Sequence, residues 1–252
     1  VSARTYAVCQ IQENSLEKYG ADVDDSVNYQ VYNNFPADKR TSKAVQDTKG
    51  QILCQNGEPI TAYYFSTSAG RTSTDEIWGA DRSAAYLKSV ECDFDQNMPW
   101  SSWSVEIPWE TLENRSGNLE GSGEFIGLQV IKKNISGAVT GMEIVTENKS
   151  IQLEGEYEIR QFLSPAGCLI TEKDGSIVNG SNLLPSAYFE LNVKSGKAVQ
   201  IQGKGYGHGV GMSQNGANEM AREGYGWQEI LNYFFKDITL EMVGNNLSKR
   251  ET

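Results

Sequence analysis

The spacing of apolar residues at the start of the chain predicts a helix. Ala3, Ala7 and Ile11 recur at four-residue intervals, which places them on one face of a helix over residues 1–18. Gly20 follows this stretch and is suited to end it, because glycine tolerates the positive φ that closes many helices. We therefore expect the chain to open with an amphipathic helix.

Capping and periodicity signals predict further helices. Thr41 or Ser42 can cap a short helix that runs through Thr48 and is closed by Gly50. Pro108 suits the first turn of another short helix, because the missing N–H of proline costs nothing there. The remaining predicted helices cover residues 156–163, 214–223 and 227–235.

Apolar runs bounded by turn residues predict strands. These strands cover residues 60–65, 105–107, 125–132, 141–146, 150–153, 188–193 and 198–202. Two pairs read as hairpins: 125–132 with 141–146, and 188–193 with 198–202, the second pair joined by a turn at Lys194–Lys197. The mixture of separate helices and antiparallel strands predicts an α+β fold.

A change of composition after Cys92 suggests two interleaved lobes. We expect one helix-plus-sheet lobe from residues 1–92 and 200–252, and a β-rich lobe, residues 93–199, inserted into it. The polar segment 243–252 is expected to fray. The 252 residues are enough for a sizeable core in one domain of this kind.

Charge excludes one class of partner. The formal net charge is −11, which repels a phosphate backbone and argues against nucleic acid. An uncharged glycan is compatible with this charge. No apolar run approaches the ~20 residues that span a bilayer. Val1 stands inside a helical pattern, so we expect the chain to be part of a longer product.

The four cysteines do not suggest a metal site. Cys9, Cys54, Cys92 and Cys168 are widely separated, no C-x-x-C pair occurs, and the chain has one histidine. Two interpretations stay open: buried free thiols, or one to two disulfides. No cofactor is predicted.

The most distinctive stretch is Gly205–Ala217, GYGHGVGMSQNGA, which contains the sole histidine, His208. Glycines alternate around His208 and permit positive φ and close approach of backbone to a ligand. A helix is predicted to begin at Ser213-Gln214. The functional interpretation is a loop that presents the His208 ring to a partner, and the structural one is a tight turn that caps the helix.

The stretches VSARTYA (Val1–Ala7), STSAGRT (Ser66–Thr72), YLKSV (Tyr86–Val90) and Gly205–Ala217 follow one another along the chain. In this order they resemble the stage II sporulation protein D family, whose members include the cell-wall amidase-enhancer proteins, and VDDSVNYQVY (Val23–Tyr32) matches more loosely. Together they extend over nearly the whole chain. Some members carry a His/Cys metal motif, but residues 24–29 offer neither ligand, so no metal is expected.

The resemblance implies lytic transglycosylase activity on peptidoglycan outside the cytoplasmic membrane. Such an enzyme cleaves the MurNAc–GlcNAc bond and leaves a 1,6-anhydro end. One carboxylic acid suffices, since it protonates the leaving oxygen and then accepts the proton of the sugar's own hydroxyl. The family's catalytic Glu lies upstream of the Ala-Arg-Thr-Tyr helix, so we expect it before residue 1, and the present chain alone is expected to be inactive.

The resemblance also implies site residues. Arg4, Tyr86, Lys88 and His208 are predicted to have catalytic or positioning roles and to lie in one groove together with Ser68, since guanidinium, ammonium and aromatic groups suit polar sugar recognition. Predicted substrate-binding residues are Ser66, Ser68, Gly70, Gly209, Ser213 and Gln214. Trp78, Trp100, Trp103 and Trp109 offer sugar-stacking faces, although tryptophan more often belongs to a core. For Arg4 the alternative is a helix-surface arginine in a salt bridge, and for Tyr86 and Lys88 it is a buried tyrosine beside a solvated lysine.

Two other functions remain open at this point. One is a non-catalytic wall-binding module that stimulates a partner amidase, and the other is an unrelated hydrolase that uses Ser68 and His208. Expected partners are peptidoglycan glycan strands, a cell-wall amidase and a membrane-anchored sporulation complex. The expected location is the cell wall or the outer face of the membrane, through an anchor outside this sequence.

Overall fold

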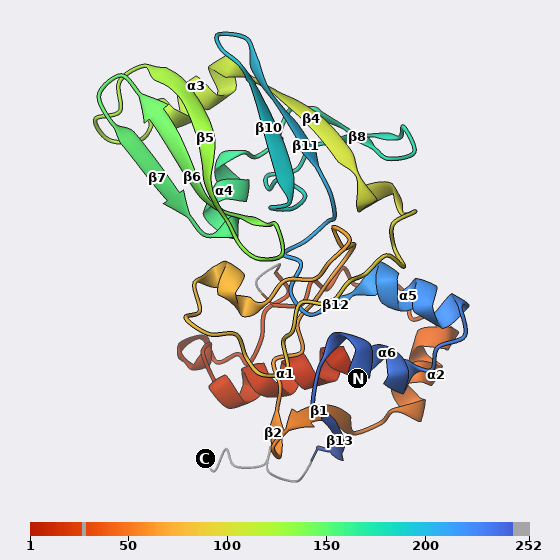
Figure 1. Ribbon diagram of the computed structural model, residues 1–252. Helices are drawn as coiled ribbons and strands as arrows, with labels where there is room; N and C mark the ends of the chain where they lie inside the picture. The colour runs from red at the N-terminus through yellow and green to blue at the C-terminus, as the bar shows by residue number, and fades with distance from the viewer. Residues whose placement is uncertain (27–28, 244–252) are drawn as a thin grey trace. The chain divides into compact units, whose positions relative to one another are not determined.

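The computed structural model describes residues 1–26 and 29–243, and it confirms the predicted α+β class. These residues form two compact units (Figure 1). The first consists of residues 1–63 and the segment that begins at Phe235, and the second of residues 64–234. Each unit has its own sheet. From residue 244 onward, the segment predicted to fray lies outside the described residues.

The first unit packs a helix against a small antiparallel sheet. Helix α1 (Ser2–Glu13) contacts β1 (Gln51–Gln55), which lies between β13 (Thr239–Met242) and β2 (Glu58–Pro59). A cluster of Val8, Ile52 and Cys54 fills the space between helix and sheet. The Leu53 N–H donates a hydrogen bond of 3.0 Å to Thr5 Oγ1, which fixes the helix on the central strand.

The first predicted helix is shorter than expected. Helix α1 ends at Glu13 because Asn14 adopts a left-handed conformation with φ 51°, which asparagine tolerates better than most residues. The rest of the predicted helix forms a separate 3-10 turn, Glu17–Tyr19, and Gly20, with φ 66°, closes that turn. Gly20 therefore ends a helical element, as predicted, but that element is the 3-10 turn and not the first helix.

The second helix begins earlier than predicted. Helix α2 (Lys39–Asp47) is capped by Asp38, whose carboxylate accepts hydrogen bonds from the N–H groups of Arg40 (2.7 Å) and Thr41 (3.4 Å). The prediction of Thr41 or Ser42 as the cap was wrong. Asp38 satisfies two backbone donors of the first turn, so the helix starts at its neighbour.

Several strands whose partners are distant in the sequence were missed or only partly predicted. Of the predicted strand 60–65, only Tyr64–Phe65 form a strand, β3, which pairs in parallel with β12 (Met212–Ser213). Strands β1 and β13 were not predicted at all. Each is short, and each becomes a strand because a segment far away in the chain supplies its hydrogen bonds.

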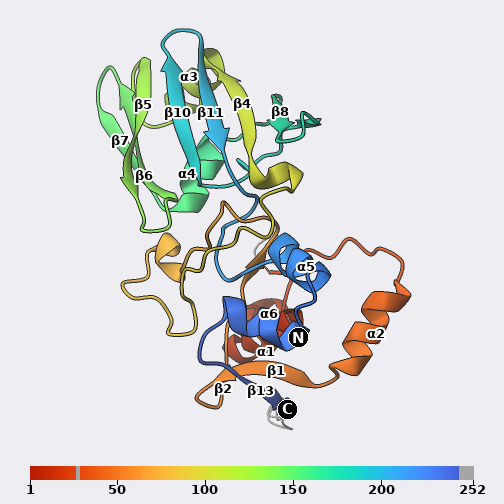
Figure 2. The same cartoon turned by 45° about the vertical axis from the view of Figure 1, so that its right-hand side comes forward.

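Two antiparallel sheets dominate the second unit (Figure 2). The five-stranded sheet has the order β10-β11-β4-β8-β9, formed by Phe189–Lys194, Ala198–Gly203, Trp103–Pro108, Leu169–Glu172 and Ile177–Asn179. The three-stranded sheet has the order β5-β6-β7, formed by Phe125–Lys133, Val139–Thr146 and Ser150–Glu154. Both predicted hairpins are confirmed, since β5 pairs with β6 and β10 with β11.

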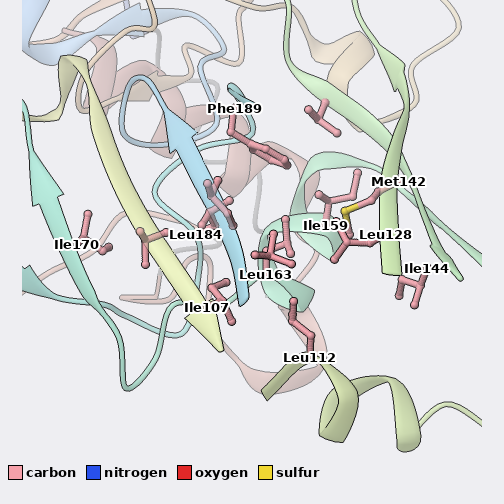
Figure 3. Packing of buried hydrophobic residues seen from close by; sticks show 14 of the residues in the cluster. Ile107, Leu112, Leu128, Met142, Ile144, Ile159, Leu163, Ile170, Leu184 and Phe189 are labelled. Atoms are coloured by element: carbon pink, nitrogen blue, oxygen red, sulfur yellow. The ribbon is translucent and has the colours of Figure 1, made fainter. Parts of the chain in front are cut away.

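The helices of this unit lie close to their predicted positions. They are α3 (Trp109–Gly117), α4 (Glu156–Phe162), α5 (Gln214–Arg222) and α6 (Trp227–Phe234), with 3-10 turns at Asp75–Trp78 and Pro99–Ser101. Figure 3 shows the main core. Ile159 of α4 and Leu163, which directly follows this helix, lie between Met142 of the three-stranded sheet and Ile107 of the five-stranded sheet. Helix α4 is thus the apolar link between the two sheets.

The compact units divide the chain at other positions than the predicted lobes. Residues 64–92 and 200–234 belong to the same unit as the β-rich segment 93–199. Backbone hydrogen bonds explain this: Tyr206 pairs with Thr67, and Ser73 N–H donates to Gly209 O at 2.6 Å. The predicted arrangement of one domain with an inserted lobe stays a prediction.

The position of Leu163 generates a test of this core. Leu163 is fully buried, so Leu163→Ala should lower the free energy of unfolding by about 2–5 kcal/mol, through lost burial and an unfilled cavity. Urea unfolding followed by circular dichroism measures it. Ile177→Ala, at a side chain that is 64% exposed on β9, should change stability by less than about 0.5 kcal/mol. Equal losses in the two variants would contradict the assigned core.

Candidate functional site

The glycine-rich segment after β11 forms a loop that only glycine can build. Gly207 (φ 111°) and Gly209 (φ 81°) both adopt positive φ. A Cβ atom at Gly207 would lie 2.8 Å from Phe65 Cβ, and one at Gly209 would lie 2.8 Å from the Tyr188 hydroxyl. The chain therefore packs its backbone directly against neighbouring side chains around His208.

The Ser66–Thr72 loop lies beside this glycine loop. Thr67 and Tyr206 exchange two backbone hydrogen bonds, of 3.1 and 2.8 Å. The same loop contacts the segment that contains Tyr86–Val90, because Thr72 N–H donates to Val90 O and Ser89 Oγ donates to Thr72 O. Three of the four sequence motifs are thus joined within the second unit.

The His208 ring lies between two aromatic side chains. Its centroid is 5.8 Å from that of Phe65 and 5.2 Å from the Trp78 ring. Nδ1 accepts a hydrogen bond of 3.1 Å from the Val210 N–H, so in the neutral ring Nε2 carries the hydrogen. The ring has a polar contact of its own within the loop and is not simply presented to solvent.

Burial keeps this imidazole neutral. Desolvation lowers the pKa of His208 to about 4, opposed by the Glu156 carboxylate and by a backbone hydrogen bond with Tyr64, and supported by the Arg160 charge. At neutral pH the imidazole is therefore neutral, and it is not suited to act as a general acid. It can orient a neighbouring group or form a hydrogen bond with a substrate.

A buried ion pair supports the Trp78 side of the histidine. Arg160 donates to Glu156 at 2.7 Å, and the two side chains are only 7% and 4% exposed. The Trp78 Nε1–H donates to the other Glu156 oxygen at 3.2 Å, and Arg160 Nε–H donates to Leu184 O at 2.8 Å. Sequence analysis missed this pair, although its i, i+4 spacing on a predicted helix was a visible signal.

Asp95 is the second residue that sequence analysis missed. Its side chain is fully buried and accepts hydrogen bonds from Ser68 N–H (2.7 Å), Ser68 Oγ (2.6 Å) and Ser213 Oγ (2.5 Å). Ser213 Oγ also accepts from Gly216 N–H as the N-cap of α5. One carboxylate therefore joins the Ser66–Thr72 loop to the start of α5.

These contacts define what Ser68 does in the structure. Its hydroxyl lies 2.6 Å from Asp95 Oδ1 and 2.9 Å from Cys92 O, and the residue is buried. A hydroxyl that donates to a buried carboxylate orders a loop; it is not placed as an exposed nucleophile beside a basic histidine. The geometry gives no support to a Ser68–His208 hydrolase.

The other predicted binding residues are distributed around the joined loops. Ser66 O accepts from Asn215 N–H at 3.0 Å, so its backbone supports α5. Gly70 has φ 95° with open space around its Cα, and Gln214 is exposed in the first turn of α5. Gln214 is thus exposed, and Ser66 and Gly70 are partly exposed, whereas Ser68, Ser213 and Gly209 are buried.

Tyr86 and Lys88 flank a buried residue. Leu87 is 1% exposed, while Tyr86 is partly buried and Lys88 is exposed. Their contact with a substrate stays a prediction.

Arg4 lies in the first unit, where its guanidinium group binds backbone carbonyls. It donates to Thr48 O at 2.6 Å, Gln51 O at 2.8 Å and Val45 O at 3.3 Å, and so joins α1 to the end of α2 and the start of β1. This is a structural role that the sequence did not indicate. The predicted groove shared with Tyr86, Lys88 and His208 stays a prediction.

The tryptophans and cysteines have mainly structural surroundings. Trp103 is buried, and its Nε1–H donates to Gly205 O at 2.9 Å, which fixes the start of the glycine loop. Trp100 packs against Tyr206 with ring centroids 4.6 Å apart. All four cysteines are free thiols, and burial raises the pKa of Cys9 and Cys54 to about 11 and that of Cys92 to about 12.

Residues 1–26 and 29–243 contain no group of three or more His, Cys, Asp or Glu side chains placed to hold a metal ion. Among the helices of these residues, none is long and apolar enough to cross a bilayer.

Comparison with known proteins gives consistent matches. A family model described as Stage II sporulation protein matches residues 1–54, and a model described as a domain of unknown function matches residues 85–211. Stage II sporulation protein D of Bacillus subtilis (strain 168) is 30% identical over 264 aligned positions, which cover 99% of this chain and 69% of that protein. The corresponding protein of Bacillus amyloliquefaciens is 29% identical over 263 positions, with the same coverage.

A third relative is longer. The amidase enhancer of Bacillus subtilis (strain 168) is 28% identical over 273 aligned positions, which cover 95% of this chain. The chain spans 37% of the length of that relative. Its matched region therefore forms one part of a larger protein there.

The Asp95 contacts generate the first prediction about the site. Asp95→Asn replaces an acceptor by an NH2 group that faces existing donors, so the free energy of unfolding should fall by about 1.5–3 kcal/mol, the range for a hydrogen bond to a charged group. Thermal or urea unfolding measures it. Asp93→Asn is the matched control, because Asp93 is exposed and two residues away. If both variants are as stable as the parent, Asp95 does not hold these loops.

The single histidine allows a direct test of its environment. The Cε1–H resonance of His208 is the only histidine signal of the chain, and its NMR titration should have a midpoint near pH 4. Since the folded pKa lies below the ordinary 6.5, the unfolded chain takes up the proton first, and stability should fall as the pH drops from about 6.5 toward 4. His208→Asn should lack this component of acid destabilisation. A midpoint near 6.5 would show that the ring is solvated.

Proposed function

Since this chain belongs to the stage II sporulation protein D family, we propose that it acts on peptidoglycan as a lytic transglycosylase that cleaves MurNAc–GlcNAc bonds in sporulation or wall remodelling. The observation that carries the proposal is the match to that family over 99% of the chain. The joining of the Ser66–Thr72, Tyr86–Val90 and His208 segments in one unit supports it, because a shared substrate can explain why the motifs meet.

The proposed reaction needs one acid and no water. The acid protonates the glycosidic oxygen, the bond from that oxygen to the MurNAc C1 breaks, and the C6 hydroxyl forms a new bond to C1. The ionised acid takes the hydroxyl proton, so protons balance and a 1,6-anhydro ring results. His208 does not suit this role, because its pKa of about 4 leaves it unprotonated at neutral pH. Asp95 does not suit it either, because it is buried among three hydrogen-bond donors.

The described residues would then bind and orient the glycan. Lys88 is an exposed cation that can donate to sugar oxygens, and Tyr86 offers a ring face and a hydroxyl. His208 would hold the glycine loop and its neighbours in one arrangement through Nδ1 and its two aromatic contacts. The general acid would be the catalytic glutamate that the family resemblance implies.

A second function is favoured by one relative. The amidase enhancer matches 95% of this chain, and its name describes stimulation of an amidase. A wall-binding module of this kind needs the binding surface and no general acid. It would act by holding a partner N-acetylmuramoyl-L-alanine amidase on the glycan strands, outside the cytoplasmic membrane.

Product analysis tests the proposed reaction. The full-length protein should release products with 1,6-anhydro ends from purified cell wall, which mass spectrometry distinguishes from reducing ends. His208→Asn and His208→Gln should each lower the rate about ten-fold to a thousand-fold, which corresponds to a few kcal/mol of transition-state stabilisation. The melting temperature of each variant shows whether the loss exceeds what destabilisation explains.

Other products would indicate a different function. Reducing ends without anhydro sugars would indicate hydrolysis and overturn the transglycosylase. Faster amidase turnover upon addition of this protein, with no glycan cleavage by the protein alone, would establish the amidase-enhancing function instead. Normal turnover in His208→Asn would remove His208 from the site.

A further inference from the structure

A pocket of about 240 Å³ opens beside the Ser66–Thr72 loop. Ala69 of that loop forms one wall, and the other walls come from the ends of β5, β10 and β11. The polar side chains that line it are Lys133, Glu190, Gln202 and Lys204. The volume is below the roughly 300–1,000 Å³ of pockets for larger ligands, so it suits one sugar ring.

Strand pairing explains why these side chains meet. Glu190 of β10 and Gln202 of β11 are direct partners in the antiparallel register, so their side chains lie on the same face of the sheet. Lys133, the last residue of β5, reaches across and pairs with Glu190 at 2.5 Å. The backbone of Lys204 is fixed as well, because its N–H donates to Tyr188 O and its carbonyl accepts from Ser186 Oγ.

The pocket contains the positive charge of Lys204, which forms no ion pair within the described part of the chain. Within residues 1–26 and 29–243, no carboxylate lies within ion-pair distance of the Lys204 ammonium group, whereas Lys133 has Glu190. Two lysines and one glutamate leave one net positive charge in the pocket of a chain whose net charge is −11. Lys204 is exposed and directly precedes Gly205, so this charge lies at the entry of the His208 loop.

We propose that this pocket binds a carboxylate-bearing sugar, with Lys204 as the main contact to the carboxylate. A lysine ammonium and a carboxylate form a charge-assisted hydrogen bond, which is stronger than a neutral one. Gln202 can donate to a sugar or acetamido oxygen, and Glu190 can accept from a hydroxyl. Lys133 contributes a second positive charge while it remains paired.

The identity of the sugar rests on the proposed function. In the MurNAc–GlcNAc repeat, the lactyl ether of MurNAc carries the one carboxyl group, and GlcNAc has none. A stem peptide attached there converts that carboxyl to an amide but brings carboxylates of its own. The shared chemistry is a carboxylate on or next to MurNAc, and the pocket would place this sugar beside the Ser66–Thr72 loop.

Binding of simple sugars tests the inference on the chain as it stands. MurNAc should bind, as measured by NMR chemical-shift changes, whereas GlcNAc should bind at least about ten-fold more weakly because it cannot pair with Lys204. Lys204→Gln should lower the affinity for MurNAc about ten-fold and leave that for GlcNAc unchanged. Raising the salt concentration should weaken MurNAc binding to the parent protein more than to this variant.

A matched control lies on the same hairpin. Lys197→Gln makes the same chemical change at an exposed lysine in the turn between β10 and β11, outside the pocket, and should leave MurNAc binding unchanged. Lys204→Gln should melt at the parent temperature, because no fold contact of the ammonium group is lost. Equal affinity of the parent protein for MurNAc and GlcNAc, or an unchanged affinity in Lys204→Gln, would overturn the proposal.

Two further experiments distinguish the possible carboxylates from each other and the pocket proposal from the proposed reaction. MurNAc that carries an L-Ala–D-Glu peptide distinguishes the carboxylates: Lys204-dependent binding of this compound but not of MurNAc would overturn the lactyl assignment and support the peptide carboxylate. Product analysis is independent of both. Lys204-dependent binding of MurNAc without any anhydro product would support the pocket proposal and overturn the proposed transglycosylase activity. Anhydro products with no contribution of Lys204 to binding would support the transglycosylase activity and overturn the pocket proposal.

Discussion

The buried carboxylate of Asp95 is the interaction on which the arrangement of the motifs depends. A charge without solvent is costly unless hydrogen bonds replace the lost water, and three donors converge on this one. Those donors come from Ser68 and Ser213, 145 positions apart in the numbering. The carboxylate thus holds the Ser66–Thr72 loop at the start of α5. The glycine loop, which ends at Ser213, is fixed at the same point.

The neutral state of His208 follows from the same packing. The ring lies between Phe65 and Trp78, and the indole of Trp78 is oriented by Glu156, which is in turn paired with Arg160. A protonated imidazole would lose hydration in these surroundings, so the neutral form is favoured. The histidine is therefore suited to fixing geometry at neutral pH, and the proton transfers of the proposed reaction fall to another group. A residue of a signature motif, such as His208, can thus position its neighbours without taking part in proton transfer.

Charge is distributed unevenly around these loops. The net charge of −11 keeps polyanions away in general, yet the pocket beside Ala69 carries an unpaired lysine. Some exposed cations elsewhere are paired, as Arg71 is with Glu91 and Lys43 with Asp47. A local positive charge in an acidic protein acts over about a Debye length, roughly 8–10 Å, so its effect is confined to a ligand already in the pocket. Selection among wall sugars, rather than long-range attraction, is what such a site can provide.

The sequence by itself determined the fold class, the β5–β6 and β10–β11 hairpins of the second unit, most of its helices and the family, because these depend on local periodicity, turn residues and ordered motifs. It located His208 and the glycines but assigned no partner to them. Only the tertiary structure decided that Ser68 and Ser213 face Asp95, that Glu156 and Arg160 support Trp78, and that Arg4 binds the carbonyls of Thr48 and Gln51. It also decided that β1 and β13 are strands. The physical reason is the same in each case: the partner lies far away in the chain, and neither a hydrogen bond nor burial can be read from one segment alone.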